Sequence, residues 1–303
     1  MNSSIDKIAD ELYLITLVPP LSGFHDFIGA WLNRGRPSFL VDVGPSSTAE
    51  ALLRTLQATD TNHLDYILLT HIHLDHAGAI GEIAEKFPDT PIVCHPEGIP
   101  HLVNPARLWE GTLKVLGATG RAYGPIKPVS AGRFISSSQF QSNAIEAVST
   151  PGHSSHHVSY QTDRRLYLGE AGGVCLSLPG HQLYLRPATP PRLFLDQALN
   201  SIDTLIAKKP SVACYGHFGL QHDAAEKLAR HRHQLLLWER MVKAQLQDDP
   251  SGDFIGICRD RLLAEDPLLR GFNHMPPDVQ ERERAFLANS IRGFLGHLNS
   301  EPS

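Results

Sequence analysis

The segment of residues 70–78 (THIHLDHAG) constrains this chain most, because three histidines and one aspartate fall within six residues. An apolar run (LDYILLT) leads into it and a helical pattern follows, so it lies at a strand-to-helix turn. Side chains at i and i+2 of an extended segment point the same way, so His71 and His73 can bind one ion. Asp75 and His76, at the turn into the helix, can reach a second. Imidazole and carboxylate together suit zinc, iron or manganese.

Short strands alternate with helices through the first 220 residues, which predicts an α/β architecture with helices covering the sheets. Strands are expected at residues 11–18, 27–33, 38–43, 64–70, 91–95, 132–136, 144–150, 157–161, 165–168 and 211–215. Helices are expected at about 46–56, 77–87 and 191–207. The stretches 96–128 and 169–191 are irregular, the first with some helix, and no strand is expected after Tyr215.

Beyond residue 222 the pattern becomes helical, with helices expected near 223–247, 254–264 and 278–298. The predicted organisation is a catalytic domain over residues 1–222, with residues 96–128 as an insertion near the site, followed by a helical extension over 223–303. The apolar stripe of the last helix is expected to be core or a homodimer contact. If the extension folds over the site, Phe254, Phe272 and Phe286 are the side chains expected to reach it.

Composition excludes several classes of protein. A formal charge of −5 and a pI near 6.4 imply no broad basic face for nucleic acid. No stretch approaches the roughly 20 apolar residues that span a bilayer, and residues 1–11 lack a basic region before an apolar core. We therefore expect a cytoplasmic protein that acts on a small molecule, with no membrane or nucleic-acid partner. The four cysteines lie far apart, which predicts neither a disulfide framework nor a thiolate zinc cluster.

The run of residues 71–76 resembles the H-x-H-x-D-H motif of the metallo-β-lactamase superfamily. Four further segments are similar to the family's other motifs, in the same order, and these are 41–44 (VDVG), 150–154 (TPGHS), 168–171 (LGEA) and 215–219 (YGHFG). The resemblance covers roughly residues 10–220. It implies an αββα sandwich, here with a C-terminal helical extension, and a site at one edge of the two sheets.

The resemblance also implies two divalent metal ions, zinc first, with iron and manganese as alternatives. Carried over by motif, the ligands of the first ion are His71, His73 and His153, those of the second are Asp75, His76 and His217, and Glu170 lies between them. Glu170 stands where the family has a bridging aspartate. Its extra methylene leaves two alternatives open, which are bridging with an adjusted backbone or changed metal spacing, and a second site that is weak or empty.

Several other residues are expected near this centre. Asp42, at the family's acidic strand end, and His157, which matches a second histidine of the T-P-G-H motif, are expected behind the ligands or against substrate. His156 and His157 are expected near the metal entrance, or alternatively on an exposed strand edge.

The remaining histidines are expected to be mostly structural or exposed. His95 and His181 are expected in the core or on the surface more often than at the site. His231 and His233, on a mixed-charge helix, are expected to be solvated.

The reaction implied is hydrolysis of an ester, thioester or lactone by a metal-bridging hydroxide, as in the glyoxalase II and lactonase-like branches. Asp75, at the metal edge, is expected to orient the nucleophile and move its proton. Lactonases of this fold often carry a tyrosine shortly after the bridging aspartate, whereas residues 171–173 here are Ala-Gly-Gly.

Two alternatives stay open. One is a mononuclear iron dioxygenase similar to the persulfide dioxygenases, with His71, His153 and Glu170 as its iron triad. The other is a non-catalytic binding or regulatory protein that reuses the fold.

Overall fold

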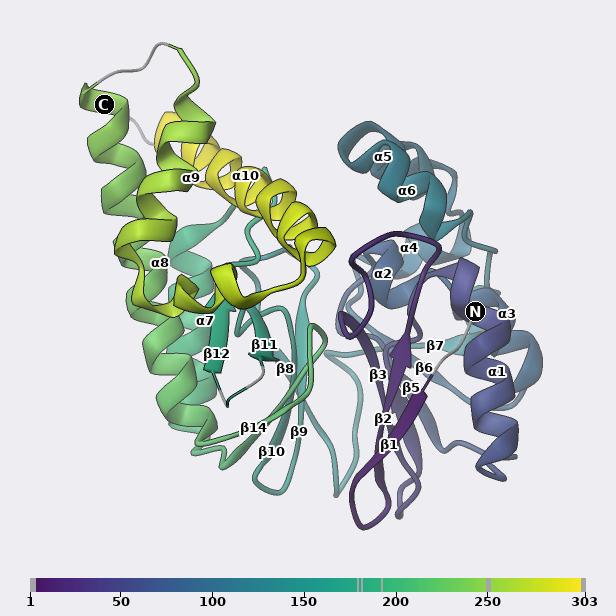
Figure 1. Cartoon of the computed structure of the whole chain (residues 1–303). Coiled ribbons are helices and arrows are strands. Elements are labelled where there is room, and N and C mark those ends of the chain that lie inside the picture. The colour runs from purple at the N-terminus through teal and green to yellow at the C-terminus, as the bar shows by residue number, and fades with distance from the viewer. Residues whose placement is uncertain (1–3, 179, 181, 192, 249–251, 301–303) are drawn as a thin grey trace.

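A computed structural model describes residues 4–300 except 179, 181, 192 and 249–251. Its two large sheets face each other in the middle of the molecule, and helices cover the outer side of each (Figure 1). This helix–sheet–sheet–helix order is the layered α/β sandwich predicted from the sequence. The helical C-terminal segment is also present, as predicted.

The first sheet has seven strands in the order of the chain. They are β1 (Ser4–Ala9), β2 (Leu12–Leu17), β3 (Ile28–Asn33), β4 (Phe39–Val41), β5 (Tyr66–Leu68), β6 (Ile92–Cys94) and β7 (Phe134–Ser136). Strands β1 to β4 pair antiparallel, and β4 to β7 pair parallel. Because parallel strands end at the same edge of a sheet, the segments that follow β4 and β5 emerge side by side.

The second sheet has five strands in the order β14-β13-β10-β9-β8, and a separate hairpin joins β11 to β12. The bounds are β8 (Glu146–Ser149), β9 (Val158–Thr162), β10 (Arg165–Gly169), β11 (Val174–Leu178), β12 (Gln182–Arg186), β13 (Val212–Tyr215) and β14 (Leu220–His222). A layer of aromatic rings fills the space between the sheets, where Tyr167 packs edge-on against Phe39 at 5.5 Å and Trp31 at 6.4 Å.

Helices connect the strands of the first half. They are the one-turn η1 (Ser46–Thr48) and η2 (Ala131–Arg133), α1 (Ala49–Ala58), α2 (Leu74–Ala77), α3 (Ile80–Lys86), α4 (Ile99–Val103), α5 (Ala106–Leu116) and α6 (Ala118–Tyr123). The insertion of residues 96–128 thus contains three short helices, α4 to α6. In the second half lie α7 (Leu195–Ala207), α8 (Ala224–Asp248), α9 (Phe254–Glu265), η4 (Pro267–His274) and α10 (Pro277–Ser300).

Three strand predictions differ from the structure. The expectation of no strand after Tyr215 is wrong, because β14 pairs antiparallel with β13 and so folds residues 216–219 into a turn. The irregular stretch 169–191 contains the β11–β12 hairpin, and the polar N-terminal segment forms β1. Strand β14 has only three residues and β1 is largely exposed, so neither shows the run of apolar residues that marks a buried strand, whereas β11 and β12 are mostly buried and lie within a stretch rich in glycine and proline.

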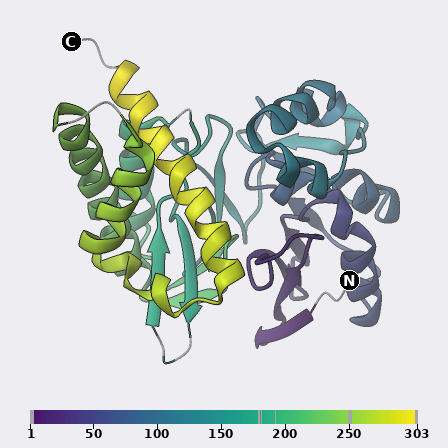
Figure 2. The same cartoon turned by 45° about the horizontal axis from the view of Figure 1, so that its top comes forward.

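The helical extension gathers over the second sheet, across the molecule from α5 and α6 (Figure 2). Helix α8 contacts α7 and β12, and α10 contacts α8 and α9. Trp238 of α8 is fully buried, with its ring 5.9 Å from that of Phe294 of α10. The division into domains at residues 222 and 223 stays a prediction. No helix among the described residues combines the length and apolarity of a membrane span.

A buried group of three charges ties α10 to β12. The Arg186 guanidinium of β12 donates from Nε to Glu283 Oε2 at 2.5 Å, and Arg282 donates from Nε to Glu283 Oε1 at 3.0 Å. Burial alone would raise the pKa of Glu283, but the two guanidinium groups outweigh it and lower that pKa. Arg282 also donates to the carbonyl oxygen of Gly23, so the group reaches the loop between β2 and β3.

Replacing Glu283 by glutamine is expected to lower the free energy of unfolding by about 3–5 kcal/mol, because two buried guanidinium groups lose their counter-charge. Urea denaturation followed by circular dichroism measures this. The matched control is Glu281→Gln on the exposed side of the same helix, expected to change stability by less than about 0.5 kcal/mol. Equal stabilities for the two variants would contradict the assigned role of the buried group.

Candidate metal centre

Seven ligand-type side chains meet at one edge of the two sheets. The contributing segments follow β5, β8 and β10 and form the turn between β13 and β14, and the residues are His71, His73, Asp75, His76, His153, Glu170 and His217. All seven were predicted from the sequence, and the structure brings them together in two groups. Their roles as metal ligands stay a prediction.

The first group comprises His71, His73, His153 and Glu170. His73 Nδ1 lies 3.0 Å from His71 Nε2 and 2.8 Å from His153 Nε2. Glu170 Oε2 lies 2.9 Å from His153 Nε2 and 3.2 Å from His71 Nε2. Three imidazole nitrogens and one carboxylate oxygen therefore face a common point.

The second group comprises Asp75, His76 and His217. His217 Nε2 lies 3.2 Å from His76 Nε2 and 3.5 Å from Asp75 Oδ2. Glu170 lies between the groups, since its Oε1 is 3.7 Å from His217 Nε2 and its Oε2 is 3.6 Å from His76 Nε2. The carboxylate is thus within reach of both groups despite its extra methylene.

The backbone before Glu170 is left-handed, with φ of 54° at Gly169. A Cβ atom there would lie 2.5 Å from His157 Nε2, so only glycine fits. This turn at the end of β10 aims the Glu170 side chain at both groups of histidines.

The outward nitrogens of three of these histidines bond to oxygen atoms of the protein. The Nδ1 partners are Asp42 Oδ2 for His76 at 2.8 Å, the Phe27 carbonyl for His217 at 2.8 Å and the Ala188 carbonyl for His153 at 2.7 Å. An Nδ1–H that donates to such an oxygen leaves the Nε2 lone pair facing the centre, which is the arrangement of metal-bound imidazoles. The donor set fits zinc, iron or manganese on this ground.

Burial and neighbouring charges favour the metal-binding protonation states of His73 and Asp75, whereas for His76 burial is outweighed by the Asp42 carboxylate, which raises the pKa to about 9. Burial, aided by the adjacent His153 and His156, lowers the pKa of His73 to about 3, so this imidazole is neutral. Burial would raise the pKa of Asp75, but its contact with His217 and the charges of His76 and His217 lower that pKa to about 2. The centre therefore presents an ionised carboxylate beside a neutral imidazole.

Asp42 lies directly behind the second group. Of the two positions expected for it, behind the ligands or against substrate, the structure shows the first. It is 2% exposed, and it accepts hydrogen bonds from the Thr70 backbone N–H and the Thr70 hydroxyl, both at 2.8 Å, besides its contact with His76. Three bonds hold this carboxylate in place. It therefore fixes both the start of the ligand loop and the orientation of His76.

His157 also lies behind the ligands and not at an entrance or an exposed strand edge. It is fully buried, its Nδ1 lies 2.7 Å from the Thr150 hydroxyl, and its Nε2 accepts the Glu170 backbone N–H at 3.1 Å. It supports the backbone of Glu170. His156 is partly buried, 3.2 Å from the Ser154 hydroxyl, with its ring 6.3 Å from that of His71.

The expectation that His231 is solvated is wrong. This α8 residue is 3% exposed and, with His153 and Glu170, lines a cavity of about 20 Å³, which is the size of one water molecule. His231 lies three residues after Leu228 and four before Leu235, both buried, and this spacing places it on the buried face of the helix. His233 is exposed, as predicted, His95 is partly buried, and His181 lies outside the described residues.

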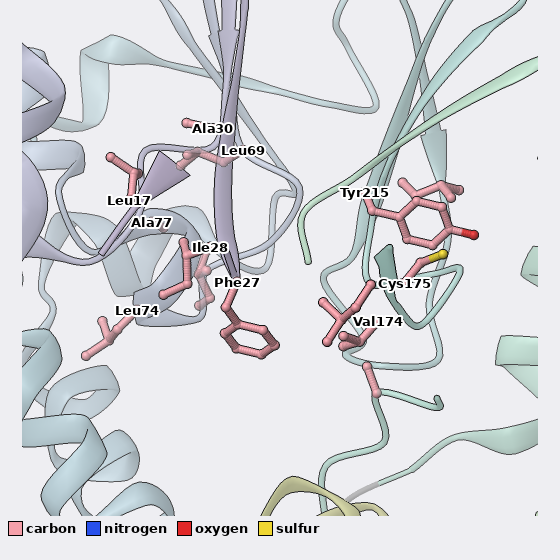
Figure 3. Packing of buried hydrophobic residues seen from close by; sticks show 14 of the residues in the cluster. Leu17, Phe27, Ile28, Ala30, Leu69, Leu74, Ala77, Val174, Cys175 and Tyr215 are labelled. Atoms are coloured by element: carbon pink, nitrogen blue, oxygen red, sulfur yellow. The ribbon is translucent and has the colours of Figure 1, made fainter. Parts of the chain in front are cut away.

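Aromatic side chains form a wall beside His217. Of these, the sequence indicated Phe286 as a side chain that could reach the site, but it did not indicate Phe27. The Phe27 ring stacks on that of His217 at 4.4 Å, and Phe286 of α10 lies 5.6 Å from Phe27. Figure 3 shows the Phe27 ring pointing into the space between the first half and the segment of Val174. Among the three phenylalanines of the extension, the ring contacts bring Phe286 to the site, whereas Phe272 packs against Arg284.

Replacing Asp42 by asparagine is expected to weaken zinc affinity by about 10- to 100-fold, because His76 loses its anionic partner. Competition with a chromogenic chelator measures this. The control is Asp65→Asn, since Asp65 also accepts a backbone N–H at a strand end, from Ser38 at 2.7 Å, but outside the site. If both variants, shown to be folded, bind zinc as the parent does, Asp42 does not support the centre.

Comparison with known proteins agrees with this geometry. Residues 30–217 match the sequence model of the Metallo-beta-lactamase superfamily. A metallo-beta-lactamase fold-containing protein of Sulfurisphaera tokodaii is 29% identical over 52% of this chain and 61% of its own length. A hydroxyacylglutathione hydrolase of Vibrio cholerae is 36% identical over 34% of this chain and 43% of its own length. The match thus spans less than two thirds of either relative.

Solved structures show the same fold. An archaeal metallo-beta-lactamase superfamily protein from Sulfolobus tokodaii superposes with a TM-score of 0.68 at 22% identity, over 94% of this chain and 98% of that chain. A metallo-beta-lactamase family protein of Thermus thermophilus gives a TM-score of 0.63 at 20% identity, over 97% and 94%. With the family's sequence model matched over more than half of its residues, this chain belongs to the metallo-beta-lactamase superfamily.

Proposed function

We propose that this protein is a metal-dependent hydrolase that cleaves an ester, thioester or lactone bond of a small molecule at a binuclear centre. One observation carries the proposal, namely the convergence of two histidine-rich groups on the Glu170 carboxylate. Bound divalent ions would supply water of lowered pKa and polarise the carbonyl group of the substrate. The first ion would be held by His71, His73 and His153 and the second by Asp75, His76 and His217, with Glu170 shared.

We assign to Asp75 the role of orienting the attacking water and transferring its proton. Its side chain is 15% exposed, against 1% for that of His76, so it is the more open member of the second group. Its lowered pKa keeps it ionised at neutral pH, and an ionised carboxylate accepts a hydrogen bond from the attacking water. Asp75 thereby orients the water and can pass its proton to the leaving oxygen or sulfur.

The surroundings favour an acyl or aromatic substrate. The wall formed by Phe24, Phe27 and Phe286 lies beside His217, and binding pockets for organic molecules are mostly apolar with few polar groups. The similarity to a hydroxyacylglutathione hydrolase supports a thioester among the substrates to be tested. We therefore place thioesters and aryl esters first in a substrate panel.

Protein purified without added metal is expected to hold about two zinc, manganese or iron atoms per chain, since two groups of ligands are present. Elemental mass spectrometry of the untagged protein measures this. A single iron per chain, with oxygen uptake on a persulfide, would instead favour the dioxygenase triad of His71, His153 and Glu170. No metal even after reconstitution would overturn both enzymatic proposals and favour a binding role.

Replacing Asp75 by alanine is expected to lower kcat about 100- to 10,000-fold on the best substrate of the panel, because the water loses its orienting carboxylate. Circular dichroism is expected to show an unchanged fold. Asp89→Ala, an exposed acid before β6, serves as the control and is expected to keep full turnover. Near-normal turnover of Asp75→Ala would refute the role assigned to this residue.

A further inference from the structure

A small cavity lies between α8 and the candidate metal centre. Its volume is about 20 Å³, which is enough for one water molecule. His153 and Glu170 line it from the centre, and His231, which is 3% exposed, lines it from α8. Thr150 and Ser201, which carry hydroxyl groups, also belong to the lining, so the cavity is polar enough to keep a water.

The orientation of the His231 ring is set by Gln234, one turn further along α8. The ring Nδ1 lies 3.2 Å from Gln234 Oε1. The Gln234 amide nitrogen donates to the Leu185 carbonyl and to Asp266 Oδ2, both at 2.7 Å, so the amide oxygen is the atom that faces the ring. Because an amide oxygen only accepts, His231 Nδ1 carries the proton and donates it.

Asp266 holds Gln234 in this orientation. The carboxylate is 1% exposed and also accepts the Trp238 indole N–H at 2.8 Å and the Leu268 backbone N–H at 2.9 Å. The buried polar side chains of α8 and η4 thus form one connected network that ends at His231. A network whose members are all bonded fixes the side chains that belong to it.

The other ring nitrogen, His231 Nε2, can only accept. Burial lowers the pKa of His231 to about 4, although the bond to Gln234 opposes this, so the ring is neutral and Nε2 keeps its lone pair. No hydrogen bond joins this nitrogen to another residue in the described part of the chain. A buried acceptor without a partner destabilises the fold, so we expect a partner in the cavity that the ring lines.

The His231 ring also lies against the turn that carries Glu170. A Cβ atom at Gly173 would lie 2.8 Å from His231 Cε1, so the ring covers this glycine directly. The Gly173 N–H donates to the Glu170 carbonyl at 2.9 Å and closes the turn. The imidazole therefore lies beside the segment that aims Glu170 at the two groups of histidines.

Glu170 can offer the cavity only oxygen atoms. Its backbone N–H is already donated to His157 Nε2, which leaves the carbonyl and carboxylate oxygens as acceptors. Two acceptors, His231 Nε2 and a Glu170 oxygen, thus line one cavity, and a molecule between them must donate to both. Water has two O–H donors and the volume that this cavity accommodates.

We propose that this cavity holds one water molecule, which donates one hydrogen to His231 Nε2 and the other to an oxygen of Glu170. His231 is thereby a positioning residue for the carboxylate that both groups of histidines share. Helix α8 belongs to the C-terminal extension, so the extension helps to set the geometry of the centre. The inference rests on the proposed binding of metal by these residues and does not depend on the reaction catalysed.

The first test is crystallographic and needs no metal. In crystals of the parent protein we expect a water within about 3.2 Å of both His231 Nε2 and a Glu170 oxygen. His231→Leu, which has no acceptor, is expected to lack this water. His231→Gln is expected to keep it, because a glutamine amide can donate to Gln234 and accept from the water. A parent whose water is missing or reaches only one of the two residues, or a water that persists in His231→Leu, overturns the proposal.

The second test measures zinc affinity by competition with a chromogenic chelator. We expect His231→Leu to bind zinc about tenfold more weakly than the parent, because Glu170 loses a supporting partner, and His231→Gln to bind within about threefold of the parent. His233→Leu, on the exposed face of the same helix, is expected to bind as the parent does. Circular dichroism checks that each variant is folded.

A further control separates the water from the packing of α8. Trp238 does not line the cavity, and Trp238→Phe removes a donor to Asp266 at the far end of the network. We expect this variant to have a lower melting temperature but parental zinc affinity. If Trp238→Phe weakens zinc binding as much as His231→Leu does, or if His231→Gln does not restore it, the effect comes from packing and the proposal is overturned.

The outcomes also separate this inference from the proposed function. A parent that shows the water on both residues but binds no zinc overturns the metal-dependent function and keeps His231 as the residue that positions Glu170. A parent that binds zinc and cleaves a substrate of the panel, with no such water or with unchanged affinity in His231→Leu, overturns the role of His231 and keeps the function.

Discussion

The Asp42 carboxylate is the point on which the rest of the site depends. It accepts the backbone N–H and the hydroxyl of Thr70 and contacts the outward nitrogen of His76. These bonds join the ends of the parallel strands β4 and β5, so the ligand loop begins at a fixed place and with a fixed direction. A buried carboxylate is stable there because every bond it makes is with a donor. The remaining ligand segments are arranged around this one.

Sequence reasoning found the ligand set because its chemistry is concentrated in short motifs. His71, His73, Asp75 and His76 are neighbours in the chain, and a strand-to-helix turn is enough to aim them at one place. The layered fold was predictable for a similar reason, since buried strands are continuous apolar runs between helical patterns. Short strands that end in polar residues, such as β14, give no such signal and were missed.

The other parts of the site depend on contacts between distant segments. Residues 96–128 have a loose pattern, and nothing in that stretch marks α6 as a neighbour of α2, which carries Asp75. For His157 the sequence leaves several positions open, among them one behind the ligands, because its bond to the Glu170 backbone N–H depends on the left-handed turn at Gly169. Such relations follow from packing and backbone geometry, which a single sequence does not display.

The C-terminal extension is connected to the centre through a stack of side chains. The Arg282 guanidinium of α10 lies 3.9 Å from the centre of the Phe27 ring, and this ring also stacks on the imidazole of His217. The Phe27 carbonyl also accepts the outward N–H of that histidine. The position of α10 therefore bears on a residue of the site even though α10 contributes none of the seven ligand-type side chains.

The two groups of ligand-type residues come from both halves of the sandwich. His71, His73, Asp75 and His76 follow a strand of the first sheet, whereas His153, Glu170 and His217 follow strands of the second. A cation held between them would link the two sheets at one edge. It would also close the long loop of chain between the segment that follows β5 and the segments that follow β8, β10 and β13. Elsewhere the two sheets are held together by buried apolar packing and by hydrogen bonds such as that from Trp31 Nε1 to the Tyr215 carbonyl at 2.9 Å. A bound cation would therefore add a direct link between the two sheets to the packing of their buried side chains.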